Sequence, residues 1–225
     1  MDYWDCSSSN SRCSDGYGLR CDTLTRMTTT PPARTLREFK TPQAFDRWLA
    51  KHHASETEVW VKLHKVGSGL PSITPREAID VALCWGWIDA VRNAFDDQSY
   101  LQRYTPRGKR SIWSQINVAN VARLEKEGRM QAPGLAQMAL AKADGRWDRA
   151  YGGSKTMEIP ADLLAALKGH PTALKTLNDL SAQNRFAIAF RLHNMKTEAG
   201  RARKLAAFVQ MLKDGKTIYP QKAKE

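Results

Sequence analysis

A predicted β-hairpin around Asp96-Asp97 constrains the fold of this chain more than any other feature. Residues 87–94 and 99–105 are expected to be strands, and the two aspartates between them are residue types that favour a tight turn. An earlier strand is expected at residues 58–65, where apolar side chains alternate with polar ones. The three strands predict a small antiparallel sheet.

Helix signals surround these strands. Thr41-Pro42 predicts one helix start, with a capping residue before proline, and Thr74-Pro75-Arg76-Glu77 predicts a second start through a capping box. Further helices are expected at residues 112–127, 133–143, 160–168, 171–180, 182–195 and 198–213. The predicted fold class is therefore α+β, a small antiparallel sheet packed by helices and followed by a helical C-terminal subdomain.

The chain divides into four expected segments. Residues 1–38 are expected to be a disordered N-terminal segment, residues 39–152 an α+β core domain, residues 153–215 a helical C-terminal subdomain and residues 216–225 a basic tail. Residues 1–26 could instead be an upstream extension of the reading frame, because Met27 could serve as the start.

The charge of the chain bears on its partners. A net charge of +12 over 225 residues favours polyanions, anionic small molecules or lipid head groups, although a well-solvated basic surface would have the same composition. No apolar run is long enough to span a membrane, and the N-terminus lacks the pattern of a signal peptide. The four cysteines imply no disulfide framework. The expected location is the cytoplasm.

The segment from Trp85 to Asn117 is the strongest candidate for a binding site. No acidic residue lies between Asp97 and Glu125. The basic residues in that interval are Arg103, Arg107, Lys109, Arg110 and Arg123. Arginine can hold a phosphate or carboxylate through two parallel hydrogen bonds, so an anion is the expected ligand.

The loop after the hairpin is the centre of this candidate site. Pro106 and Gly108 stiffen and turn its backbone. The cations expected to project from it are Arg107, Lys109 and Arg110. Ser111 or Ser114 could cap the next helix, whose first N–H groups attract an anion. The alternative is a solvated basic loop whose Trp113 belongs to the core.

Asp89 and Trp87 are expected to support the loop. Asp89 would orient Arg103 or Arg107 through an ion pair, and Trp87 would form a wall. Purely structural roles would leave the same pattern. The full set of predicted ligand-binding residues is Trp87, Asp89, Arg107, Lys109, Arg110, Trp113, Ser114 and Asn117.

No metal site or cofactor is predicted. The histidines do not pair at metal-ligand spacing, and the chain has no short Cys pair, Walker loop, Gly-x-Gly-x-x-Gly turn or Gly-x-Ser-x-Gly elbow. No catalytic residue is predicted either.

Several motifs in fixed order resemble the bacteriocin-protection family, also described as YdeI or OmpD-associated. They are Cys84-Trp85-Gly86-Trp87-Ile88-Asp89, Tyr104-Thr105-Pro106-Arg107, Ser111-Ile112-Trp113-Ser114-Gln115-Ile116-Asn117 and Ala143-Asp144-Gly145-Arg146-Trp147. The resemblance covers roughly residues 40–215. It implies a small cytoplasmic protein linked to tolerance of bacteriocins or other stress, and it carries no catalytic residues.

Three functional hypotheses follow. The preferred one is a non-catalytic protein of this family that binds an anionic ligand or partner through the basic, tryptophan-containing loop. The second is sequence-independent nucleic-acid binding by the basic face. The third is an enzyme that acts on a phosphorylated or acidic metabolite, with Asp89 as the base; it requires Asp89, Arg107 and Ser114 to share one pocket.

Overall fold

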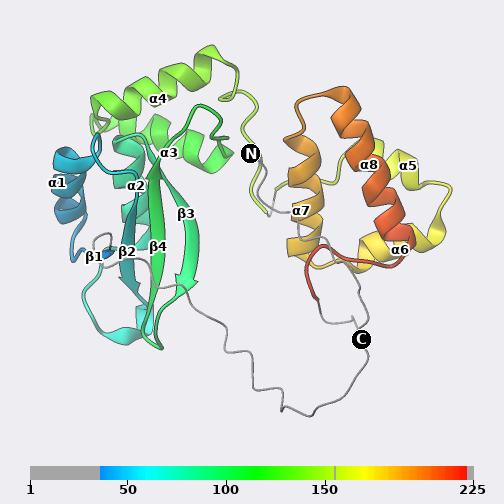
Figure 1. Cartoon of the computed structure of the whole chain (residues 1–225), viewed down its shortest axis with the longest axis horizontal. Helices are drawn as coiled ribbons and strands as arrows, with labels where there is room; N and C mark the ends of the chain where they lie inside the picture. Colours follow the sequence, from blue (N-terminus) through cyan, green and yellow to red (C-terminus); the bar gives the residue numbers. More distant parts are fainter. Residues whose placement is uncertain (1–35, 155, 222–225) are drawn as a thin grey trace, which may run out of the picture. The chain divides into compact units, whose positions relative to one another are not determined.

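The computed structural model describes residues 36–154 and 156–221 (Figure 1). The hypothesis that residues 1–26 are an upstream extension therefore concerns a segment outside the described residues. Most of the expected N-terminal segment, residues 1–38, lies outside them as well.

The described residues contain a four-stranded mixed sheet in the order β1-β2-β4-β3 (Figure 1). Its strands are β1 (Leu36–Glu38), β2 (Val59–His64), β3 (Trp87–Ala94) and β4 (Ser99–Pro106). The antiparallel pairs β2–β4 and β3–β4 confirm the predicted sheet, including its hairpin. The sequence did not predict β1, which pairs in parallel with β2 and places Leu36 opposite Trp60. Residues 36–38, the last three of the expected N-terminal segment 1–38, thus form a strand.

Helices account for most of the remaining described chain. They are α1 (Pro42–His52), α2 (Pro75–Cys84), α3 (Gln115–Lys126), α4 (Ala132–Ala143), α5 (Ala161–Leu167), α6 (Pro171–Asp179), α7 (Ala182–His193) and α8 (Glu198–Lys213), with a single 3₁₀ turn, η1, at Val66–Ser68. Every predicted helix is present, and the fold class is confirmed as α+β with a helical C-terminal region. No helix among the described residues combines the length and apolar character that a membrane span requires.

The helix starts have the predicted chemistry. Thr41 caps α1 by accepting a hydrogen bond from the backbone N–H of Ala44 at 3.3 Å. At α2 the capping box is complete, because the Thr74 hydroxyl accepts from the Glu77 N–H at 3.2 Å and the Glu77 carboxylate accepts from the Thr74 N–H at 2.9 Å. These hydrogen bonds lower the pKa of Glu77.

Two hydrophobic cores lie around the sheet, and α2 contributes to both. Helices α1 and α2 pack against the sheet through buried side chains that include Phe45, Leu49, Val59, Val61, Val81 and Tyr104. Helices α2, α3 and α4 enclose a second core that includes Leu83, Cys84, Trp113, Val121, Leu124 and Met138. Helices α5 to α8 surround a core of their own, built on Leu163, Leu177, Ile188, Leu192 and Leu212 (Figure 1).

Helix α4 crosses the C-terminal end of α2 at very short range. A Cβ atom on Gly134 would lie 2.2 Å from the carbonyl oxygen of Cys84 and 2.8 Å from that of Leu83. The same α2 end continues into β3 through Gly86, whose φ of +72° suits glycine. The α2–α4 contact therefore lies beside the point where the chain leaves α2 and enters β3.

Candidate functional site

The loop after β4 is held by a tight turn. The Gly108 N–H donates to the Ser111 hydroxyl at 2.9 Å, and the Ser111 N–H donates to the Gly108 carbonyl at 3.0 Å. Lys109 and Arg110 are exposed on this turn, as the sequence predicts. Arg107 differs from the prediction: its side chain is only 4% exposed, so it does not project from the loop.

Backbone geometry explains the inward direction of Arg107. Its N–H donates to the Gly86 carbonyl at 2.9 Å, which extends the β3–β4 pairing past Pro106. The guanidinium carbon then lies 3.6 Å from the centre of the Trp113 ring, a close cation–π contact. Burial lowers the pKa of Arg107 to about 10. We call these two stacked side chains the Arg107–Trp113 pair.

The Arg107–Trp113 pair has buried N–H groups without acceptors. Arg107 Nη1 donates to the Ile112 carbonyl at 3.2 Å. Arg107 Nε and Nη2 and Trp113 Nε1 are buried and find no acceptor among the described residues. Trp113 also packs against Trp147, with ring centres 5.0 Å apart, so it is both a core residue and the platform for Arg107.

Asp89 faces Arg107 but does not pair with it. The carboxylate is half-buried, and this burial raises its pKa, while the charges of Arg107 and Arg92 act in the opposite direction. No described residue lies within ion-pair distance of it. The alternative expected partner, Arg103, instead donates from Nε to the Glu58 carboxylate at 2.7 Å.

The remaining predicted site residues have mainly structural surroundings. Trp87 is 1% exposed and packs edge-on against Trp48, so it lies in the core. Of the two candidate caps for α3, Ser114 is the actual one, and its hydroxyl accepts from the Asn117 N–H at 3.1 Å. Asn117 is half-buried in the first turn of that helix.

Tyr151 joins this cluster, and the sequence did not indicate it. Its N–H donates to the Trp113 carbonyl at 3.0 Å, and its carbonyl accepts from the Gln115 N–H at 2.9 Å. Burial raises the pKa of the Tyr151 phenol, whereas a hydrogen bond with Ser114 and the charge of Arg107 lower it. Asp89, Arg107, Ser114 and Tyr151 therefore form one cluster, in which Arg107 and Ser114 are buried and Asp89 and Tyr151 are half-buried.

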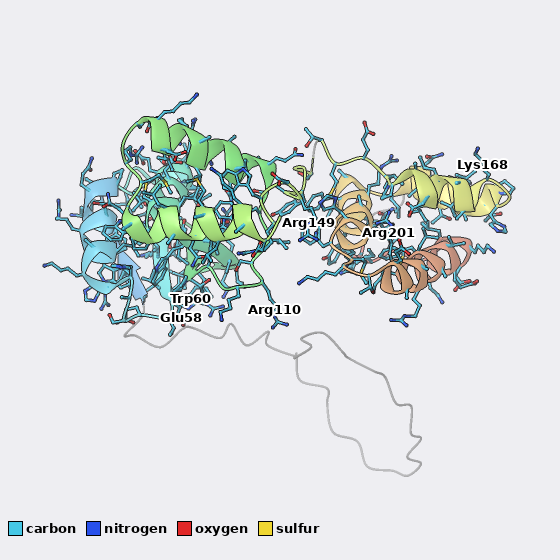
Figure 2. The ribbon with its side chains drawn as sticks, turned by 90° about the horizontal axis from the view of Figure 1, so that it is seen from above. Glu58, Trp60, Arg110, Arg149, Lys168 and Arg201 are labelled. Atoms are coloured by element: carbon cyan, nitrogen blue, oxygen red, sulfur yellow. The ribbon has the colours of Figure 1, made fainter. Side chains whose placement is uncertain are left out.

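Arg110 lines a cavity of about 100 Å³ that we call the basic cavity. Its lining residues are Arg110, Ile112, Arg146, Arg149, His193, Asn194, Met195 and Lys196. Five of these residues are basic and none is acidic. Arg110 and Arg149 are labelled in Figure 2. Sequence reasoning identified only Arg110, because the other cations come from distant segments.

The cations of the basic cavity are not equally neutralised. Arg146 Nε donates to the Asp144 carboxylate at 2.7 Å, and its Nη1 donates to the Ser111 carbonyl at 2.9 Å. Arg149 is held by carbonyl oxygens, with its Nε donating to Gly145 at 3.2 Å. Arg110 and Lys196 make no ion pair with any described residue. The cavity therefore keeps an excess of positive charge.

The more distant C-terminal cations are arranged differently. Arg201, labelled in Figure 2, donates from Nε and Nη2 to the two oxygens of Asp162 at 2.9 Å each. It lies outside the basic cavity, whose only contributions from the C-terminal region are His193 to Lys196. His193 Nε2 lies 3.0 Å from the Arg149 carbonyl, to which it donates. Within the described chain, no group of three or more His, Cys, Asp or Glu residues could hold a metal ion.

Two family models match separate parts of the chain. Residues 37–137 match a domain of unknown function (DUF8412), and residues 156–215 match the family described as bacteriocin-protection, YdeI or OmpD-associated. Comparisons with curated proteins and with solved structures gave no match. The family predicted from the sequence is confirmed. Its match, however, lies on the C-terminal helices, whereas Trp85 to Asn117 lie within the domain of unknown function. Residues 156–215, which contain α5 to α8, therefore form a domain of the bacteriocin-protection, YdeI or OmpD-associated family.

Proposed function

We propose that this protein contributes to bacteriocin protection or stress tolerance in the cytoplasm by binding an anionic ligand, without catalysing a reaction. The observation that carries the proposal is the basic cavity, where five basic side chains and no carboxylate line a single small space. Charge of one sign around a concave surface raises the local concentration of the opposite ion.

The lining residues suggest the ligand class. Arg110 and Lys196 have no anionic partner among the described residues, so they can bind a ligand without breaking an ion pair. Ile112, which is 40% exposed, and Met195 add an apolar wall. A volume of about 100 Å³ accommodates a phosphate or carboxylate group rather than a whole nucleotide. We therefore expect a small anion, or the anionic end of a larger molecule.

The chemistry of the lining also favours binding over catalysis. A hydrolytic or proton-transfer site needs a nucleophile or a titrating base that faces the ligand. No acidic, Ser, Thr or Cys side chain lines this cavity, and the His193 imidazole is already engaged by the Arg149 carbonyl. The lining residues thus supply charge and shape, and no general base.

Thermal-shift titrations with orthophosphate, citrate and a short oligonucleotide would test the proposal. A ligand at 100 times its Kd stabilises a protein by ~2.7 kcal/mol, which corresponds to a rise in Tm of roughly 5–11 °C for a chain of this size. The variant Arg110→Ala/Lys196→Ala should lose this rise. The matched control, Lys109→Ala/Lys168→Ala, removes the same charge at exposed residues outside the cavity and should keep it.

Two results would contradict the proposal. One is an equal rise in Tm in the wild type and in Arg110→Ala/Lys196→Ala, and the other is the absence of any rise with all three probes. A third pattern of results would indicate that the basic face binds nucleic acid instead. In that case only the oligonucleotide binds, both double variants lose affinity for it equally, and the logarithm of its association constant falls by about 0.9 per contacted phosphate for each unit of log salt.

A further inference from the structure

Arg107 has one edge of its guanidinium without an acceptor. Nε and Nη2 lie on the same edge of an arginine and can donate two parallel hydrogen bonds to a carboxylate. Arg201 uses this edge in the same chain, holding Asp162 with two bonds of 2.9 Å. In Arg107, these same two atoms are buried and have no acceptor among the described residues.

The rest of Arg107 is fixed in place. The backbone N–H is bonded to Gly86, Nη1 is bonded to Ile112, and the guanidinium plane lies against Trp113. The side chain has therefore already lost its rotational freedom, and an anion that binds the remaining edge would not bear that entropic cost. Trp113 Nε1 adds a third buried donor within the same stacked pair.

The surroundings of this edge favour a ligand with a single negative charge. Leaving buried N–H donors unpaired is unfavourable, and a carboxylate would satisfy two of them at once. One negative charge balances Arg107, whereas a second, as in a phosphate dianion, would face the nearby Asp89 carboxylate. Asp89 and Tyr151 are half-buried, so the cluster reaches the protein surface at these two residues.

We propose that the Nε–Nη2 edge of Arg107, together with Trp113 Nε1, binds the carboxylate of a small monocarboxylic acid. This site does not depend on the proposed function, because none of its residues lines the basic cavity. Asp89 lies near Arg107, and its charge opposes the binding of an anion when it is ionised.

The test is calorimetric titration of the full chain with sodium formate and sodium acetate, at constant ionic strength with chloride as the compensating salt. We expect both acids to bind the wild type. Arg107→Lys keeps the charge but removes the two-pronged edge, so affinity should fall at least about tenfold, the value of one charge-assisted hydrogen bond. Arg110→Ala/Lys196→Ala should retain the formate binding that Arg107→Lys loses, whatever anion binding it loses at the basic cavity, and this separates the two sites.

Asp89→Asn provides a second test, because its expected effect on formate affinity would not occur if Arg107 had only a structural role. Removing the opposing charge should tighten formate binding several-fold at neutral pH, and this measurement still decides the question if Arg107→Lys fails to fold. The proposal is overturned if neither acid binds the wild type, if orthophosphate binds and formate does not, or if Asp89→Asn leaves the affinity unchanged.

Discussion

Replacing Gly134 with alanine tests the α2–α4 contact, on which the position of the candidate site depends. A methyl group at this position would lie 2.2 Å from the Cys84 carbonyl oxygen and 2.8 Å from the carbonyl carbon of the same residue. These are backbone atoms at the end of α2, so they cannot rotate away as a flexible side chain could. The two helices would have to move apart for the methyl group to fit.

The expected magnitude is the balance of two effects. Alanine is more favourable than glycine inside a helix by ~1 kcal/mol. Overpacking a close contact costs ~1–3 kcal/mol, and a backbone clash belongs at the upper end of that range. We therefore expect Gly134→Ala to lower the free energy of unfolding by about 2 kcal/mol, which corresponds to a fall in Tm of about 4–8 °C for a chain of this size.

Chemical and thermal unfolding of Gly134→Ala would measure this change. Gly67→Ala is the matched control, because a Cβ atom there meets nothing within 4 Å; it should change the free energy of unfolding by less than ~0.5 kcal/mol. If Gly134→Ala is as stable as the control, or is stabilised by the ~1 kcal/mol of helix propensity alone, the helices do not approach as closely as described and the reasoning is wrong.

Three further changes test the surroundings of the site. Arg123→Ala should lower the free energy of unfolding by ~3 kcal/mol in urea denaturation, because it leaves the buried Asp80 without the guanidinium that donates to its two carboxylate oxygens at 2.6 and 2.7 Å. A loss no larger than that caused by Arg129→Ala, at an exposed residue, would argue against this ion pair. Ser114→Ala should lower the free energy of unfolding by ~1 kcal/mol in the same assay, because it removes the N-terminal cap of α3. An unchanged free energy of unfolding would mean that water replaces the cap. Folding raises the pKa of Asp89 above its unfolded value of ~3.9. The free energy of unfolding of the wild type, compared with that of Asp89→Asn, should therefore fall as the pH rises from the unfolded pKa through the folded pKa, and then level off. A difference in Tm that is constant from acidic to neutral pH would contradict that shift.

Local patterns explain which parts of the fold could be predicted. The capping box at Thr74 and the hairpin around Asp96-Asp97 are signals carried by neighbouring residues, and both are confirmed. Strand β1 has only three residues, without a clear alternation, and it exists because it pairs with β2. Nothing in residues 36–38 alone distinguishes them from the preceding chain.

The candidate site was less predictable for the same reason. The basic loop and its tryptophan were visible in the sequence, but the direction of Arg107 depends on its bond to Gly86, and Gly86 is distant in sequence. The basic cavity joins Arg110 with Arg146, Arg149 and Lys196. Only the folded chain brings these cations together, so no local spacing could reveal them.

The backbone hydrogen bonds between Tyr151 and the start of α3 have a practical consequence for dissecting the protein. The matched N-terminal domain ends at residue 137, in the middle of α4, yet Ala141 and Trp147 pack into the same core as Trp113. A fragment cut at that boundary would lose this packing and leave the Trp113 carbonyl and the Gln115 N–H without their partners. An expression fragment meant to fold as the α+β domain should therefore extend through residue 151, well beyond the limit that family matching suggests.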